Sequence, residues 1–160
     1  MKTLLLLVCL TSPSFLLGAE PISKSEYSQA CSKVEKCVRS VLKEGASTFV
    51  MDKTPGKAKR SDFINFLSKL QKLAEPHVKR TPPKMKFEPK KVKVGAQLLG
   101  KVRVLVEGGF LARVGPIITR DSEDLVLDEF GDALGLFLAR IADLTHVPRS
   151  KFSPAMMDGG

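Results

Sequence analysis

The feature that most constrains the fold is a long segment near the C-terminus, residues 123–144, in which apolar side chains recur at helical spacing. These side chains cover most of the circumference of the helix that the spacing predicts, and a helix that is apolar nearly all round has to be buried. Ser122 is placed to cap it, and the acidic residues that follow suit the positive end of the helix dipole. We therefore expect the rest of the chain to cover this helix. Its apolar residues are Val126, Leu127, Phe130, Leu134, Phe137, Leu138, Ile141 and Leu144.

Small residues recur every four positions along the same segment, at Gly131, Gly135 and Ala139. In a membrane, such a strip favours pairing of helices. In a water-soluble domain it lets another backbone approach closely, and we expect a sheet to pack there.

The first nineteen residues have the anatomy of an export signal. A single cation, Lys2, precedes the apolar run 4–10, and the small residues Gly18 and Ala19 follow. The apolar run is too short to cross a bilayer, which takes about 20 residues. We expect cleavage near Ala19 and a secreted or periplasmic product with one domain, residues 20–150, and a loose tail, residues 151–160.

Export would leave two cysteines, Cys31 and Cys37, and an even pair in an exported chain favours a disulfide. In one continuous helix their axial separation would be about 9 Å, beyond the roughly 7 Å that a bridge tolerates. The bridge therefore requires a helix that starts at Ser32, where a capping-box pattern with Glu35 allows a start. A second capping-box pattern begins at Ser23 and would leave both thiols free. We adopt the disulfide as the prediction.

The central part of the chain indicates two more helices and a small sheet. Helices are predicted over 32–43 and 61–73. Residues 101–119 are rich in β-branched side chains, and 107–109 would form a hairpin loop with Gly109 in the left-handed conformation. A third strand is predicted near 91–96, which gives an α+β fold, although helix competes over 97–106. The second helix would bury Phe63, Phe66, Leu67 and Leu70.

Charge is unevenly distributed in this basic chain, whose formal net charge is +9. Residues 77–93 hold seven cations and three prolines against one acid, Glu88. Their lysines could contact an anionic polymer or membrane surface, dock onto the acidic C-terminal helix, or protect an edge strand from aggregation. The seven cations are Lys79, Arg80, Lys84, Lys86, Lys90, Lys91 and Lys93.

No catalytic residue, metal site or cofactor is predicted. Asp124, Asp128 and Asp132 are four residues apart and could together hold a hard cation, but the glycine of a calcium-binding loop is missing. The sequence also has no phosphate-binding glycine loop and no nucleophile elbow. The single aromatic residue in 77–93 provides no stacking platform for single-stranded nucleic acid.

These features predict a small exported protein without catalytic activity, which binds a partner or has a structural role. The partner would be an anionic polymer or surface, or another protein. Two alternatives remain: a metal-dependent enzyme that uses the acidic helix 123–132, and a secretory precursor that is cleaved after Arg60, at the end of the basic run 57–60.

Overall fold

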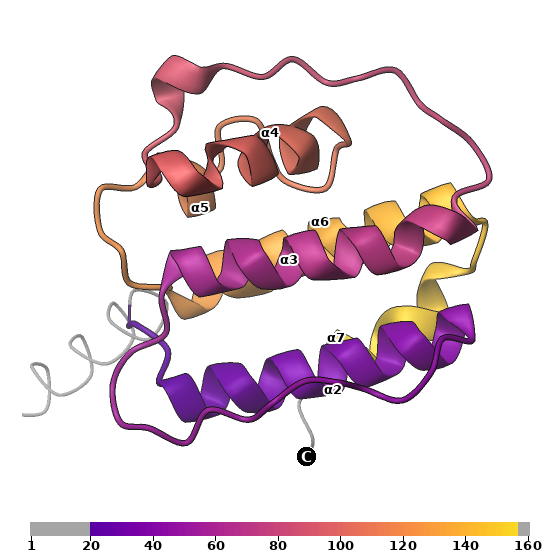
Figure 1. Ribbon diagram of the computed structural model, residues 1–160, viewed down its shortest axis with the longest axis horizontal. Helices are drawn as coiled ribbons and strands as arrows, with labels where there is room; N and C mark the ends of the chain where they lie inside the picture. Colours follow the sequence, from indigo (N-terminus) through magenta and orange to yellow (C-terminus); the bar gives the residue numbers. More distant parts are fainter. Residues whose placement is uncertain (1–19, 157–160) are drawn as a thin grey trace, which may run out of the picture.

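The computed structural model describes residues 20–156 as an all-α domain with six α-helices and, within that range, no β-strand. The three longest helices, α2 (Lys24–Leu42), α3 (Arg60–Ala74) and α6 (Leu127–Thr145), form its body. The shorter α4 (Leu99–Glu107) packs on α3, and α5 (Pro116–Thr119) packs on α6 (Figure 1). The predicted α+β fold is therefore wrong. The predicted export signal, residues 1–19, lies outside the described residues.

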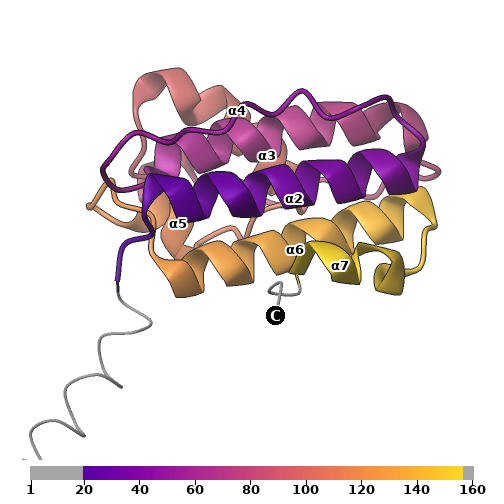
Figure 2. The ribbon, with the colours of Figure 1, turned by 90° about the horizontal axis from the view of Figure 1, so that it is seen from below.

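The three long helices run in the same direction, and backbone hydrogen bonds join the segments that immediately precede them (Figures 1 and 2). The amide of Ile22 donates to Leu125 at 2.9 Å, that of Ala58 to Ile22 at 2.8 Å, and that of Leu125 to Ala58 at 3.0 Å. These bonds close a three-membered cycle, which we call the backbone ring. At the opposite end of the domain, Glu44 follows α2 and His77 follows α3. Oε1 of Glu44 lies 2.7 Å from Nε2 of His77.

Parallel packing needs long return connections. Residues 43–59 run back along α2, and residues 75–126, which include α4 and α5, run back beside α3 and α6 (Figure 1). Since all three helices begin at one end, the positive ends of their dipoles lie together. The acids Glu26, Asp62 and Asp128 occupy their first turns, where negative charge is favourable.

Helix α2 begins earlier than predicted, and this start removes the basis for the disulfide. Ser23 is the N-cap, and it exchanges hydrogen bonds with Glu26 in a complete capping box. Cys31 and Cys37 therefore lie within one continuous helix, and both thiols are free. The expected Cys31–Cys37 bridge is absent because the helix that contains both residues is not interrupted at Ser32.

The predicted second helix and the core role of the C-terminal helix are confirmed, with shifted ends. Helix α3 is capped by the backbone of Lys59 rather than by Ser61, and its four predicted core residues are buried. Helix α6 starts at Leu127, later than predicted, with Val126 as its N-cap. Leu127 itself is half exposed, but the other apolar residues named for this helix are buried. The largest core side chains come from α3 and α6.

The predicted hairpin over 101–119 is wrong, because its first half is helix α4. Val102, Leu105 and Val106 are buried at helical spacing, and the helix packs on α3. Gly109 does adopt the expected left-handed conformation, with φ of 77°. It does so just after a helix end, however, where the amide of Gly108 still donates to Val104. The predicted third strand is also absent, since 91–96 joins two short 3-10 helices, η2 (Pro89–Lys91) and η3 (Ala96–Leu98).

The C-terminal residues pack on the domain instead of forming the predicted loose tail. The 3-10 helix η4 (Arg149–Phe152) and the one-turn helix α7 (Ser153–Met156) contact α2, and η4 also contacts α6. Phe152 and Ala155 are buried. A side chain added at Gly135 would meet Met156 at 3.7 Å. In the small-residue strip of α6, Gly135 therefore faces the end of the chain and not a sheet, while Gly131 is open. Residues 157–160 lie outside the described part.

Candidate anionic-partner interface

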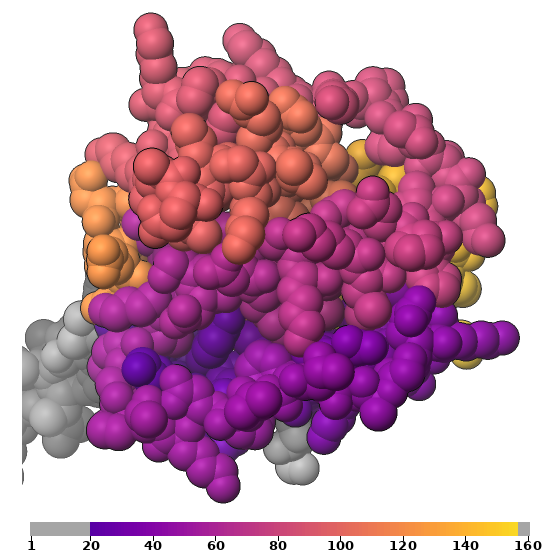
Figure 3. Space-filling model, viewed as in Figure 1, coloured from indigo at the N-terminus to yellow at the C-terminus, as the bar shows by residue number. Residues whose placement is uncertain are grey.

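The seven cations predicted to contact a partner lie on an extended connection, residues 77–93, which we call the basic strap. Between η1 (Glu75–His77) and η3 it crosses the domain at the upper edge of the view in Figures 1 and 3. Three backbone hydrogen bonds anchor it. The amide of Lys79 donates to the carbonyl oxygen of Leu144 at 2.7 Å, that of Met85 to Glu107 at 2.8 Å, and that of Lys93 to Ile118 at 2.6 Å. The strap is therefore fixed to α6, α4 and α5 without being part of a sheet.

Some strap cations are already neutralised by acids of the domain. Lys84 lies 3.7 Å from Glu107, and Lys91 lies 2.9 Å from Glu88. The hydrogen bond from Lys91 holds the pKa of Glu88 below its ordinary value. Lys93 lies 2.8 Å from Asp121. The remaining four strap cations are exposed and form no ion pair within residues 20–156: Lys79, Arg80, Lys86 and Lys90.

Helix α4 and the turn after it add cations that lie outside the seven predicted from the sequence. The guanidinium of Arg103 lies over the ring of Phe87, 5.2 Å from its centroid. Arg113 lies 3.7 Å from Glu88. Lys101 is exposed on α4 and donates to Asn65. The predicted hairpin did not place these cations beside the strap. Helix α4 does so, because it turns Arg103 toward Phe87.

The three aspartates considered as metal ligands are not brought together. Asp124 precedes α6 and pairs with Lys59 at 2.8 Å, while Asp128 and Asp132 are exposed on the helix. The reason is the later start of α6, which leaves Asp124 in an extended segment that bridges to Lys59. Across residues 20–156, no three side chains from His, Cys, Asp or Glu are grouped so that they could hold a metal ion.

The residue at the proposed processing site is buried. Only 4% of Arg60 is exposed, and its guanidinium donates to the carbonyl oxygens of Ile117, Ser122 and Arg120 at 2.5, 2.6 and 2.7 Å. A longer bond reaches Lys93 at the end of the strap. Arg60 thus holds the connections around α5 in place, and a protease could not bind it without opening this part of the fold.

An apolar pocket of about 250 Å³ lies between α5 and α6. Leu111, Ile117 and Ile118 line one side, and Ala133 and Leu136 of α6 line the other. Glu129 borders the pocket, where Arg120 lies 2.7 Å from its Oε1. Asp128 and Asp132 also line the pocket, and Oε2 of Glu129 is buried without a hydrogen-bond partner within residues 20–156. No Ser, Thr, Cys, His or Lys of the described residues lines the pocket.

The fold and this surface together define an all-α domain with an exposed basic strap. No helix in the described residues is both long and apolar enough to span a bilayer. Comparison of the chain with protein-family models, with curated proteins and with solved structures found no match.

Proposed function

We propose that this protein acts after export as a non-catalytic binding protein, which engages an anionic partner through the basic strap. The observation that carries the proposal is the set of four exposed strap cations that have no acidic partner within residues 20–156. Lysine and arginine heads left unpaired on a chain with net charge +9 attract polyanions from solution.

Two other roles for these cations have less support. Protection of an edge strand requires a sheet, and residues 20–156 contain no strand. Docking onto the acidic C-terminal helix would require ion pairs with that helix. The acids that pair with strap cations are instead Glu88, Glu107 and Asp121, none of which belongs to α6.

The two alternative functions are also less well supported by the geometry. The metal-dependent enzyme needs ligands that converge, and the three aspartates do not. The secretory precursor needs access to Arg60, which is enclosed by carbonyl groups.

Binding to immobilised heparin over a range of salt concentrations tests the proposal. Each cation that displaces counterions from the polyanion makes log affinity fall more steeply with log salt. Replacement of Lys79, Arg80, Lys86 and Lys90 by Gln should therefore weaken binding at low salt and flatten this slope. Thermal stability should change little, because these side chains are exposed and unpaired.

A control of equal charge removes four lysines from α2 and the loop after it. Replacement of Lys33, Lys36, Lys43 and Lys53 by Gln lowers the net charge by the same amount, away from the strap. The proposal predicts a much smaller effect of this control. Equal effects of the two variants would mean that only net charge matters, and absence of heparin binding at low salt would contradict the proposed function.

A further inference from the structure

Exposed apolar side chains lie near the cations of the strap, of α4 and of the turn after α4. Met85, Val104 and Val114 are 52%, 51% and 52% exposed. The amide of Met85 donates to Glu107, one turn after Val104 on α4. Val114 follows Arg113, which reaches Glu88 on the strap. The three exposed side chains therefore come from adjoining segments, the strap, α4 and the turn after α4, which we call the strap surface.

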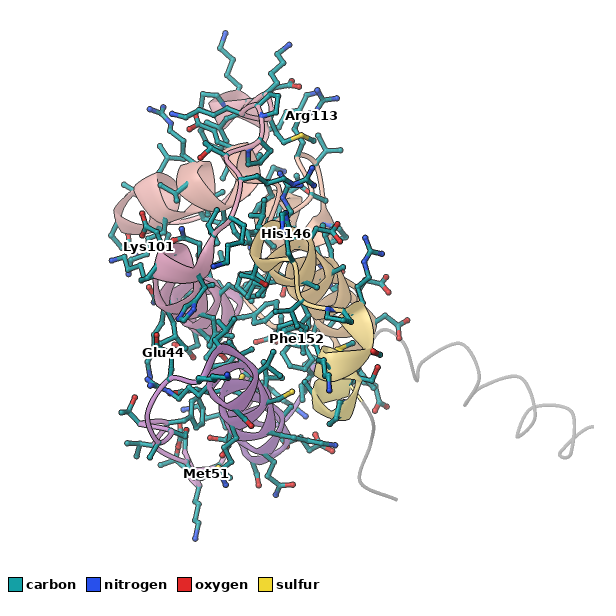
Figure 4. The ribbon with its side chains drawn as sticks, turned by 90° about the vertical axis from the view of Figure 1, so that its right-hand side faces the viewer. Glu44, Met51, Lys101, Arg113, His146 and Phe152 are labelled. Carbon is teal, nitrogen blue, oxygen red and sulfur yellow. The ribbon has the colours of Figure 1, made fainter. Side chains whose placement is uncertain are left out.

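Cations surround these apolar residues. Lys84 and Lys86 flank Met85, Arg103 precedes Val104, and Arg113 precedes Val114. The acids on this surface are largely covered: the side chains of Glu88 and Glu107 are 22% and 28% exposed, and both are paired with cations. Figure 4 shows Arg113 and Lys101 toward one end of the molecule and Met51 at the other.

Cations alone suffice to bind a soluble polyanion such as heparin, which has no apolar interior for exposed apolar side chains to enter. The interface of an anionic bilayer takes up both kinds of side chain, since apolar groups enter between the headgroups while lysine and arginine contact the phosphates. Long basic side chains can also extend from a partly inserted surface back to the headgroups.

We infer that this surface docks on an anionic lipid membrane, with Met85, Val104 and Val114 entering the headgroup region. The inference rests on the proposed function and specifies its partner. The charged part of the surface provides attraction, and the three apolar side chains provide the preference for a bilayer over a soluble polyanion.

Vesicle binding distinguishes the two kinds of partner. The mature protein is mixed with vesicles of phosphatidylglycerol and phosphatidylcholine, or of phosphatidylcholine alone, and sedimented. We expect binding to the anionic vesicles only. Replacement of Met85, Val104 and Val114 by Ser should weaken that binding about tenfold or more, since each apolar side chain contributes on burial. Heparin binding by the same variant should be unchanged.

The control replaces other exposed apolar residues, Val50, Met51 and Leu127, by Ser. It should bind anionic vesicles like the wild type, and circular dichroism should show that both variants are folded. If the first variant binds vesicles as well as the wild type does, the inference fails but charge-dependent binding to a polyanion stands. If neither vesicles nor heparin bind at low salt, the inference and the proposed function both fail.

Discussion

The buried carboxylate of Glu35 joins α2, the loop after it and α3. Its side chain has no exposed surface, and Oε1 accepts from Nε of Arg39 at 2.8 Å and from the amide of Thr48 at 3.1 Å. Lys69 lies 3.3 Å from Oε2. Burial raises the pKa of Glu35, but the hydrogen bonds from Arg39, Thr48 and Lys69 outweigh burial and keep this pKa below its ordinary value. Loss of this charge would leave buried donors without an acceptor of equal strength.

We expect replacement of Glu35 by Gln to lower the free energy of unfolding at neutral pH by about 2–4 kcal/mol. Because the pKa of Glu35 is depressed in the folded state, its stabilising contribution is fully present above its unfolded pKa of about 4.3. It is lost as pH falls through the lower folded value. Urea unfolding of wild type and variant should therefore give curves that converge in acid. Glu75→Gln, at an exposed position, is the control, and a difference that stays constant down to low pH would contradict the expectation.

The two thiols should differ in reactivity. Burial raises the pKa of Cys31 to about 12, and its side chain has no access to solvent. Cys37 is partly exposed, although burial also raises its pKa. Iodoacetamide should therefore modify Cys37 first in the native protein and Cys31 only after unfolding. Mass spectrometry of the peptides measures this order, and a linked Cys31–Cys37 peptide from freshly purified protein would contradict the free thiols.

At the scale of elements, the C-terminal segment should contribute to stability through one side chain. Phe152 is buried where η4 meets α2 and α6. Phe152→Ala should lower the free energy of unfolding by about 3–5 kcal/mol, the usual cost of an aromatic side chain removed from a core. Met156→Ala, at a position that is 44% exposed, is the matched control and should cost much less. Equal small effects in denaturant unfolding would mean that this segment does not belong to the core.

The sequence predicted the helices with strong apolar periodicity and missed the element whose local signals conflict. The apolar residues of α3 and α6 recur at helical spacing and do not alternate as in a strand, so their sequences indicate helix. In α4, Val102, Val104 and Val106 alternate as in a strand, whereas Val102, Leu105 and Val106 match a helix, and packing on α3 decides between them. Such a tertiary contact between distant segments cannot be recognised from local spacing.

The candidate surface was predictable only in part for the same reason. Composition alone identifies the strap, because seven cations gather in 77–93. The addition of Arg103 and Arg113 depends on α4 being a helix next to the strap. The division between paired and unpaired strap cations depends on acids that are distant in the sequence, such as Asp121 beside Lys93.

For the whole molecule, the parallel arrangement of α2, α3 and α6 accounts for the placement of several charges at its two ends. Acids of the first turns gather where the three positive dipole ends lie, while Arg39 and Lys72 occupy the last turns of α2 and α3. The charges thus offset the alignment of the three dipoles.

The backbone ring should be necessary for this arrangement. Ala58→Pro removes the amide that donates to Ile22 and places a bulkier ring at a buried position. We expect the free energy of unfolding to fall by about 3 kcal/mol or more. Lys53→Pro lies in the same loop, where the amide makes no backbone bond, and serves as the control. Thermal unfolding measures both variants, and similar melting temperatures would show that the ring is dispensable.

The ring also determines when folding can finish. About 100 residues separate Ile22 from Leu125, so the ring cannot close until most of the polypeptide has left the ribosome. At roughly 5–20 residues per second, synthesis of that length takes at least about 5 s. Until then, the N-terminal residues lack their final partners. The topology that holds the finished domain together therefore makes its completion a late event in synthesis of the chain.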